Sequence, residues 1–388
     1  MESVIKPFNT KRIYLLFLIF PVIQLGMSYY LSVFFIAFLF YGIISFYIPA
    51  LQKRWNLIII STFLFLLKVF VEILNNASIT DILLPLRHLV CFIGIIIISE
   101  NLIKAHLPLQ KVKLLIGCFL IILLGVVLAQ YYYFSKGIFF GIPIDLFVMN
   151  KGTLEGASKA LYYGTRFRPV GFYGEPSYNS WIVISLLMII LIRDEFTKKF
   201  KYTFIIISYL IIIISQAMSG FFAINIILLT WFIKTNRDSL IYIVVLVLIS
   251  IILFVINKNF QIFERLYGII EGSDRSYNGR LIQPLEYIKE IWKNQSLFGI
   301  PNYSDIRDDI DNAAIALVLN YGILSIPIFL AFVKLFKHNW LLILYILLSL
   351  NFNGSIFRFD KVLVLSLVIG LSYCTFSNFL GKSRASFI

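Results

Sequence analysis

One short stretch of the sequence gathers residues that could do chemistry: Arg166-Phe-Arg-Pro-Val-Gly-Phe-Tyr-Gly-Glu-Pro-Ser-Tyr178. It joins arginines and a carboxylate to aromatic side chains, directly before an apolar run from Trp181 to Ile192. Charged groups at a membrane surface are costly unless they meet a partner or a ligand. The stretch therefore indicates an anionic or polyhydroxyl ligand. The plainer alternative is a helix entry whose arginines bind lipid phosphates.

The carboxylate of this stretch is expected at the start of a helix. Pro176 suits the first helical turn, where its missing N–H leaves no bond unmade. Glu175 and Ser177 would then lie at the helix N-terminus, at the rim of the membrane.

Composition predicts the elements that must position these residues. Of the 388 residues, 60% are hydrophobic and 14% are charged, unlike a soluble domain. Recurring apolar stretches predict an all-α, polytopic integral membrane protein with about twelve transmembrane helices, in one domain over residues 1–388. The predicted spans are 13–28, 31–50, 57–74, 82–102, 114–134, 177–192, 202–217, 220–233, 240–256, 312–333, 340–352 and 361–379.

The basic residues predict the orientation of these spans. The N-terminus and the alternate connections carry eighteen Lys and Arg, whereas the short connections on the other side carry only Arg358. By the positive-inside rule, both termini face the cytoplasm. Two long connections, residues 135–176 and 257–311, are then external loops.

Both long loops are basic, which favours a phosphate, a pyrophosphate or an acidic sugar as partner. Nucleic acid is not expected, because no binding motif accompanies the charge. Within the second loop, residues 284–295 place apolar side chains on one helical face. This spacing predicts an amphipathic helix that lies on the membrane surface.

A few ionisable residues fall inside apolar spans, where they are candidates for function. Lys68 and Glu72 are four residues apart and can pair, and Arg87 and His88 lie in the next span. All lie toward the external ends, at a level similar to Arg358. Two interpretations stay open: a salt bridge that only fixes helix packing, or a cavity lined by basic groups and open to the outer leaflet.

A second polar group belongs to the second loop and contains Arg280, four aspartates from Asp305 to Asp311, and Asn312. The aspartates could hold a divalent cation, but their spacing matches no EF-hand, so a solvated acidic loop is the better interpretation. Asp311 and Asn312 also suit the N-cap of the tenth span. The sequence predicts no metal site and no nucleotide-driven chemistry.

These motifs resemble those of the O-antigen polymerase and O-antigen ligase superfamily of bacterial polysaccharide assembly. The resemblance rests on Gly171-Phe-Tyr-Gly-Glu-Pro-Ser177, on Ser276-Tyr-Asn-Gly-Arg280, and on Asp311-Asn312 followed by Leu319-Asn-Tyr-Gly322. The span count and the two long external loops agree with it. The Glu-Pro-Ser element at this location favours the polymerase branch. Ligases typically carry a histidine where this chain has Asp311, which disfavours the ligase branch.

The resemblance implies a glycosyltransferase of the bacterial cytoplasmic (inner) membrane, with its active site facing the periplasm or exterior. It would polymerise repeat units carried on polyisoprenyl pyrophosphate into O-antigen or capsule-type polysaccharide. No cofactor is needed, because the pyrophosphate bond supplies the driving force. Besides membrane lipid, a chain-length regulator and a flippase are implied partners. Alternatives are an O-antigen ligase and, from another class, a lipid-linked oligosaccharide flippase or transporter.

Such a transfer needs a base for the acceptor hydroxyl and cations for the leaving pyrophosphate. Glu175 and Asp311 are the competing bases, and Arg280 is the expected catalytic cation; alternatively, Glu175 only braces a neighbouring arginine. The expected substrate-binding residues are Arg166, Arg168, Tyr173, Ser177, Tyr178, Asn312, Arg87, His88 and Arg358.

Overall fold

The computed structural model describes residues 54–104, 109–138, 140, 168–173, 175–235, 268, 271–272, 278, 282–293, 297–300, 303, 312–336, 339–351, 357 and 361–372. Within these residues every regular element is a helix and none is a strand. The all-α class predicted from the apolar composition is therefore confirmed for the described part of the chain.

The helices follow one another along the chain with short or undescribed connections. They are α4 (Trp55–Leu74), α5 (Ile79–Lys104), α6 (Leu109–Ser135), α8 (Pro176–Ile192), α9 (Lys198–Ile214), α10 (Met218–Thr235), α14 (Gln283–Lys293), α16 (Ala313–Tyr321), the 3-10 turn η5 (Gly322–Leu324), α17 (Ser325–Lys334) and α18 (Trp340–Ser349). A further apolar helix, the C-terminal helix, covers Lys361–Ser372.

Five of the described stretches are long and apolar enough to cross a membrane: α4, α5, α6, α10 and the stretch Ala313–Lys334. Each coincides with a span predicted from the sequence, which agrees with a membrane-embedded protein. The count of about twelve spans stays a prediction, because the spans at 13–28, 31–50 and 240–256 lie outside the described residues.

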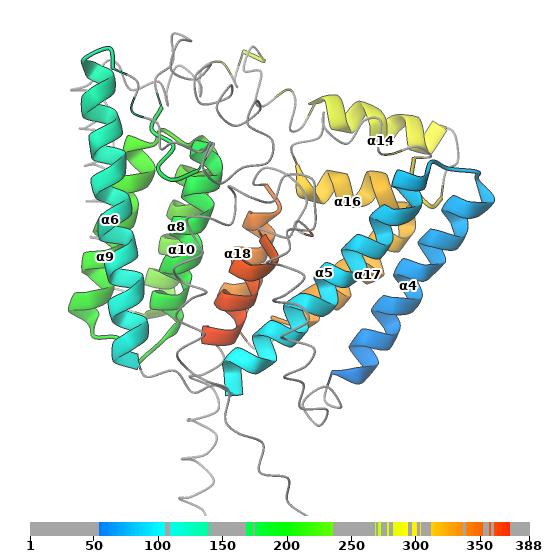
Figure 1. Cartoon of the computed structure of the whole chain (residues 1–388), viewed down its shortest axis with the longest axis horizontal. Helices are drawn as coiled ribbons and strands as arrows, with labels where there is room; N and C mark the ends of the chain where they lie inside the picture. The colour runs from blue at the N-terminus through cyan, green and yellow to red at the C-terminus, as the bar shows by residue number, and fades with distance from the viewer. Residues whose placement is uncertain are drawn as a thin grey trace, which may run out of the picture.

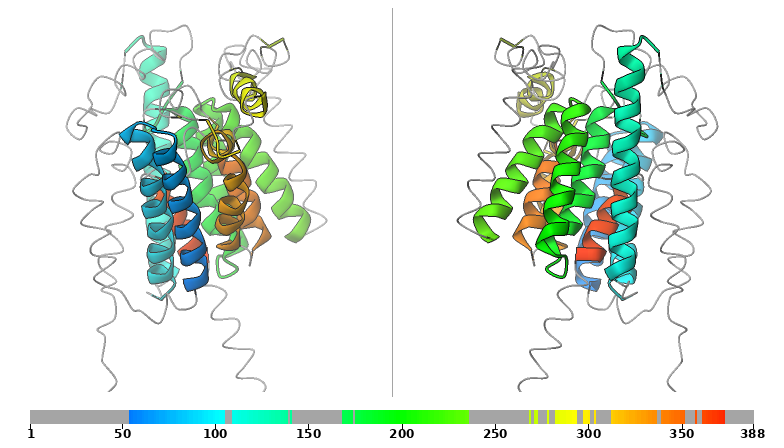
Figure 2. Two further views of the ribbon diagram at one scale, coloured as in Figure 1. Left: turned by 90° about the vertical axis from the view of Figure 1, so that its right-hand side faces the viewer. Right: turned by 90° about the vertical axis from the view of Figure 1, so that its left-hand side faces the viewer.

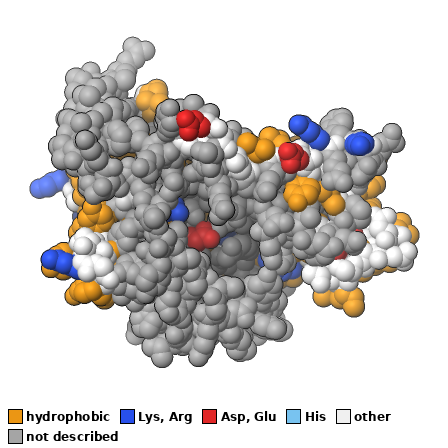
Figure 3. All heavy atoms as spheres, turned by 90° about the horizontal axis from the view of Figure 1, so that it is seen from above, with side chains coloured by type: hydrophobic (Ala, Val, Ile, Leu, Met, Phe, Trp, Pro, Cys, Tyr) orange, Lys and Arg blue, Asp and Glu red, His pale blue; other side chains and the backbone are white. Residues whose placement is uncertain are grey.

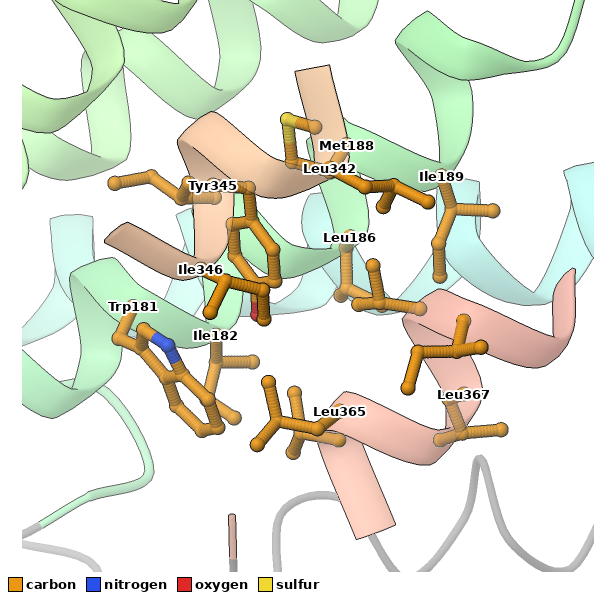
Figure 4. Packing of buried hydrophobic residues seen from close by; sticks show 14 of the residues in the cluster. Trp181, Ile182, Leu186, Met188, Ile189, Leu342, Tyr345, Ile346, Leu365 and Leu367 are labelled. Carbon is orange, nitrogen blue, oxygen red and sulfur yellow. The ribbon is translucent and has the colours of Figure 1, made fainter. Parts of the chain in front are cut away.

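Helix α8 is the centre of the hydrophobic core. It is buried along its length up to Leu191, and α9, α10 and α18 pack against it. Because its polar and apolar side chains alike are buried, α8 is enclosed by protein and is not a helix that faces lipid on one side. Figure 4 shows its Trp181 and Leu186 gathered with Tyr345 of α18 and Leu365 of the C-terminal helix. The start of this central helix carries Glu175.

The helices form two groups that stand side by side (Figures 1 and 2). One group holds α6, α8, α9 and α10; the other holds α4, α5 and α17, and α18 lies between them. The short helices α14 and α16 lie crosswise over the upper end of the second group and pack against each other. This upper end, where α4 and α6 end and α8 begins, is the end that the sequence predicts to be external.

The amphipathic helix expected within residues 284–295 corresponds to α14. Its Tyr287 and Ile288 pack against a small apolar cluster that includes Ile315 and Leu319 of α16. Leu285 stays exposed on another side of α14. Contact of α14 with a membrane surface stays a prediction.

The tenth predicted span is not one straight helix. α16 ends at Tyr321, η5 follows, and α17 leaves in a new direction (Figure 1). Gly322, at the break, has a φ of +53°, which residues with a side chain rarely adopt. The apolar run over 312–333 conceals this break, because hydropathy reports burial and not helix direction.

The end of the second long loop closes the break. The Ile323 N–H donates to the Leu297 carbonyl at 2.8 Å, and the Ile300 N–H donates to the Leu319 carbonyl at 2.8 Å. A Cβ atom on Gly322 would lie 2.2 Å from the Leu297 oxygen, so the two backbones are in direct contact. Backbone groups that the broken helix leaves without helical partners are thereby bonded inside the protein.

A buried ion pair on α4 supports the same loop end. Lys68 and Glu72 form the i, i+4 pair predicted from the sequence, and only 2% of each side chain is exposed. The Lys68 ammonium also donates to the Phe298 carbonyl at 2.7 Å. Because the pair is enclosed and bonded to a neighbouring backbone, its role is in packing and not in lining an open cavity.

We predict that Lys68→Met destabilises the protein by about 3–5 kcal/mol, since it leaves the Glu72 carboxylate buried without its cation. Lys68→Met combined with Glu72→Leu should recover much of this loss, because two apolar side chains need no partner. Thermal unfolding of the purified protein in detergent measures both effects. Lys199→Met, at an exposed lysine of α9, is the control and should change stability little. An unchanged melting temperature in Lys68→Met would contradict this role.

Candidate functional site

The backbone next to Arg168 is fixed by one buried amide. Gln130 of α6 is fully buried, and its Oε1 accepts from the N–H groups of Val170 at 3.0 Å and Gly171 at 2.8 Å. Its Nε2 donates to the Gly171 carbonyl at 2.9 Å. These bonds attach the end of the first long loop to the helix bundle.

A tight turn follows directly. The Tyr173 N–H donates to the Val170 carbonyl at 3.2 Å, and Gly171 adopts a φ of +66°. A Cβ atom on Gly171 would lie 2.7 Å from Asn179 Oδ1 and 2.9 Å from Leu123 Cδ1. The turn is therefore pressed between α6 and α8, and only glycine fits at this point.

Glu175 is the N-cap residue of α8, with extended backbone angles, and Pro176 lies in the first helical turn. The helix start predicted from the sequence is confirmed. Glu175 is half-buried, and one of its carboxylate oxygens accepts a hydrogen bond from the Ser177 hydroxyl at 3.1 Å. Its carbonyl accepts from the Asn179 N–H at 3.1 Å, the first bond of the helix. Its carboxylate thus stands at the positive end of the helix dipole.

The aromatic residues expected to bind sugar are enclosed. Tyr173 and Tyr178 are 0% and 2% exposed, and their ring centroids lie 5.2 Å apart. The ring of Tyr178 in turn packs against Trp181, at 5.4 Å between centroids. Burial raises the pKa of the Tyr173 phenol well above its usual value, because the charged phenolate is disfavoured away from water. Both tyrosines pack the turn against α8, which argues against direct sugar contact; Phe172 is only partly buried.

The polar residues predicted on α5 lie inside the second group of helices. His88 is 4% exposed, and its Nδ1 is 2.7 Å from the Tyr321 hydroxyl at the break between α16 and α17. Arg87 is half-buried. His88 is buried and bonded to Tyr321, so it does not line an open cavity. At this residue the structure does not support the interpretation of a cavity lined by basic groups.

Asn312 serves as a helix cap, as the sequence predicts. Its Oδ1 accepts from the N–H groups of Ala314 at 3.0 Å and Ile315 at 3.2 Å, and its Nδ2 donates to Asn351 Oδ1 at 3.3 Å. With its carboxamide engaged on both sides, Asn312 positions the start of α16. Four other predicted site residues lie outside the described residues: Arg166, Arg280, Asp311 and Arg358.

Two residues near the site were not identified from the sequence. Gln130 is a lone amide in an apolar span, and it carries no charge that would mark it as a candidate. Lys361, at the start of the C-terminal helix, is 1% exposed, and its ammonium lies 5.5 Å from the ring centroid of Trp181. The Trp181 indole N–H donates to Ser349 Oγ at 3.1 Å. Lys361 therefore places a buried cation against the indole of α8.

The described part of the site can supply acid–base chemistry and cationic binding. The Gln130-bound turn and the start of α8 bring the Arg168 guanidinium and the Glu175 carboxylate onto one short segment at the upper end of the bundle. Seen from above, this face shows an acidic and a basic side chain near its middle (Figure 3). A carboxylate can accept a proton and a guanidinium can bind an anion in such a place.

Comparison with known proteins found no family model, no curated protein and no solved structure that matches the chain.

We predict that Gly171→Ala lowers stability by at least about 1–2 kcal/mol, the usual cost of a left-handed backbone for a residue with a Cβ. The contact with Asn179 should add to this loss. Two control glycines separate the causes. Gly137 has a φ of +74°, but a Cβ atom there would meet nothing within 4 Å, so Gly137→Ala isolates the effect of the backbone angle. Gly125 lies on α6 and also has nothing within 4 Å of an added Cβ atom, so Gly125→Ala tests a helical glycine with free space. Thermal unfolding should show the largest loss for Gly171→Ala, a smaller loss for Gly137→Ala and no loss for Gly125→Ala, since alanine is the better helix former. Equal losses at Gly171 and Gly137 would show that the close packing has no effect.

Proposed function

We propose that the protein is a membrane glycosyltransferase that polymerises oligosaccharide repeat units carried on polyisoprenyl pyrophosphate. The structural observation that supports this most is a carboxylate and a guanidinium on one tethered segment, at the edge of an apolar helix bundle. A lipid-linked donor needs an apolar surface next to charged groups, because its tail requires lipid and its pyrophosphate requires cations. The resemblance of the Gly-Phe-Tyr-Gly-Glu-Pro-Ser element to O-antigen polymerases supports the same assignment.

The transfer would proceed by attack of an acceptor hydroxyl on the anomeric carbon of the donor sugar. The new glycosidic bond forms while the bond from that carbon to the pyrophosphate oxygen breaks. Glu175 would accept the hydroxyl proton, and arginines would stabilise the charge that develops on the pyrophosphate. The leaving group is the polyisoprenyl pyrophosphate itself. Among the described residues, Arg168 is the arginine that we propose for stabilising the pyrophosphate. Arg280 is proposed for the same role from the sequence.

A deletion strain tests the class of reaction. Electrophoresis of its surface polysaccharide should show a single repeat unit on the acceptor, because polymerisation alone is lost. Loss of a ligase would leave no repeat unit on the acceptor. Loss of a flippase would also leave none and would accumulate lipid-linked repeat units on the cytoplasmic side. Either of these patterns would contradict the polymerase proposal.

We predict that Glu175→Gln abolishes polymer formation but preserves binding of the lipid-linked donor, since glutamine keeps the shape and removes the base. Glu195→Gln, at a carboxylate paired with Arg193 in the connection between α8 and α9, is the matched control and should polymerise normally. Polymer length in complemented deletion cells and donor binding by the purified protein are the two measurements. Full-length polymer from Glu175→Gln together with an inactive Asp311→Asn would transfer the role to Asp311.

The proposed external site also predicts a topology. Reporters fused after Gly152 or Gly272 should read as external, and those fused near Thr197 or after Gly381 should read as cytoplasmic. A cytoplasmic reading at Gly272 would place Arg280 on the wrong side of the membrane for an externally presented donor.

A further inference from the structure

Gln130 has a position that packing alone does not explain. It lies five residues before the end of α6, about 7.5 Å below the helix end at 1.5 Å per residue, and it is fully buried. An amide in apolar surroundings costs about 1–3 kcal/mol for each group left without a hydrogen bond. Both ends of this amide are used, and all its bonds go to the backbone of Val170 and Gly171, 40 and 41 residues away in the chain.

The bonded backbone leads directly to the two charged residues of the site. Arg168 lies two residues before Val170, and the turn closed by Tyr173 leads into Glu175 at the start of α8. Asn179 of α8 lies close to the other side of the turn, since a Cβ atom on Gly171 would lie 2.7 Å from its Oδ1. The carboxamide of Gln130 therefore sets where this backbone lies between α6 and α8.

We propose that Gln130 is a positioning residue that holds Arg168 and Glu175 in their working arrangement; this rests on the polymerase function proposed above. Gln130 acts through the backbone and does not touch substrate. The physical reason is that catalytic groups must be held in place before the substrate arrives, and a displacement of about 1 Å costs on the order of 100-fold in rate. A turn whose backbone is bonded to a buried amide is held in place before any substrate binds.

The test compares three variants in proteoliposomes with a lipid-linked repeat unit as substrate. Gln130→Leu removes all the bonds at nearly constant volume. Gln130→Glu keeps oxygen acceptors for the N–H groups of Val170 and Gly171. Asn225→Leu is the control, because within the described part of the chain this part-buried amide on α10 bonds the Phe221 carbonyl of its own helix and the Tyr209 hydroxyl, and no loop.

We expect Gln130→Leu to lower kcat by about 10- to 100-fold per folded molecule, with KM for the donor changed less. Gln130→Glu should recover part of this loss, and Asn225→Leu should match the wild type. Hydrogen exchange of the peptide over 168–173 should speed up in Gln130→Leu alone. Wild-type kcat in Gln130→Leu, or a loss explained by less folded protein, would overturn the proposal.

The same experiment separates the positioning proposal from the polymerase proposal. A wild-type protein that makes no polymer would refute the polymerase function, and the proposal that rests on it. Unchanged exchange of residues 168–173 in Gln130→Leu would refute the positioning role whatever reaction the protein performs. Polymer from the wild type with equal kcat in all variants would refute the positioning role alone.

Discussion

A polar group inside an apolar helix bundle must find its hydrogen bonds within the protein, since no water is there to supply them. In this protein, buried polar side chains on helices form these hydrogen bonds with the backbone of the long loops. Gln130 on α6 bonds the backbone at Val170 and Gly171, and Lys68 on α4, paired with Glu72, bonds the Phe298 carbonyl. The ends of the two long loops are therefore part of the hydrophobic bundle and not appendages above it.

This constraint explains why the site lies where the two groups of helices begin and end. α8 is enclosed by its neighbours, so its N-terminus has one fixed place, and Glu175 stands there as the cap residue. The segment before it is fixed through Gln130 on the opposite side. The second loop is fixed in the same way at the break in the helix after Tyr321. Polymerisation at a lipid boundary would use this rigidity to orient a donor whose tail stays in lipid.

Local and compositional features of the fold could be predicted from the sequence. The apolar runs predicted α4, α5, α6 and α10, and the i, i+4 spacing predicted the Lys68–Glu72 pair. Pro176 and Asn312 marked the starts of α8 and α16 because capping depends on neighbouring residues only.

Features that depend on distant partners could not be predicted. Gln130 meets a backbone 40 residues away, so no local pattern reveals its role. The break at Gly322 is stabilised by a hydrogen bond from the Ile323 N–H to the Leu297 carbonyl. The apolar run over 312–333 contains no sign of this contact with the second loop. Tyr173 was expected to bind substrate, yet it is buried in the turn whose backbone Gln130 bonds.

The most direct test of the account is polymerisation by the purified protein alone. The protein is reconstituted into liposomes, supplied with a polyisoprenyl-pyrophosphate-linked repeat unit, and its products are separated by electrophoresis. We predict a ladder of products that differ by one repeat unit, with one polyisoprenyl pyrophosphate released for each glycosidic bond formed. A folded protein that returns only the single repeat unit, with no pyrophosphate carrier released, would contradict it.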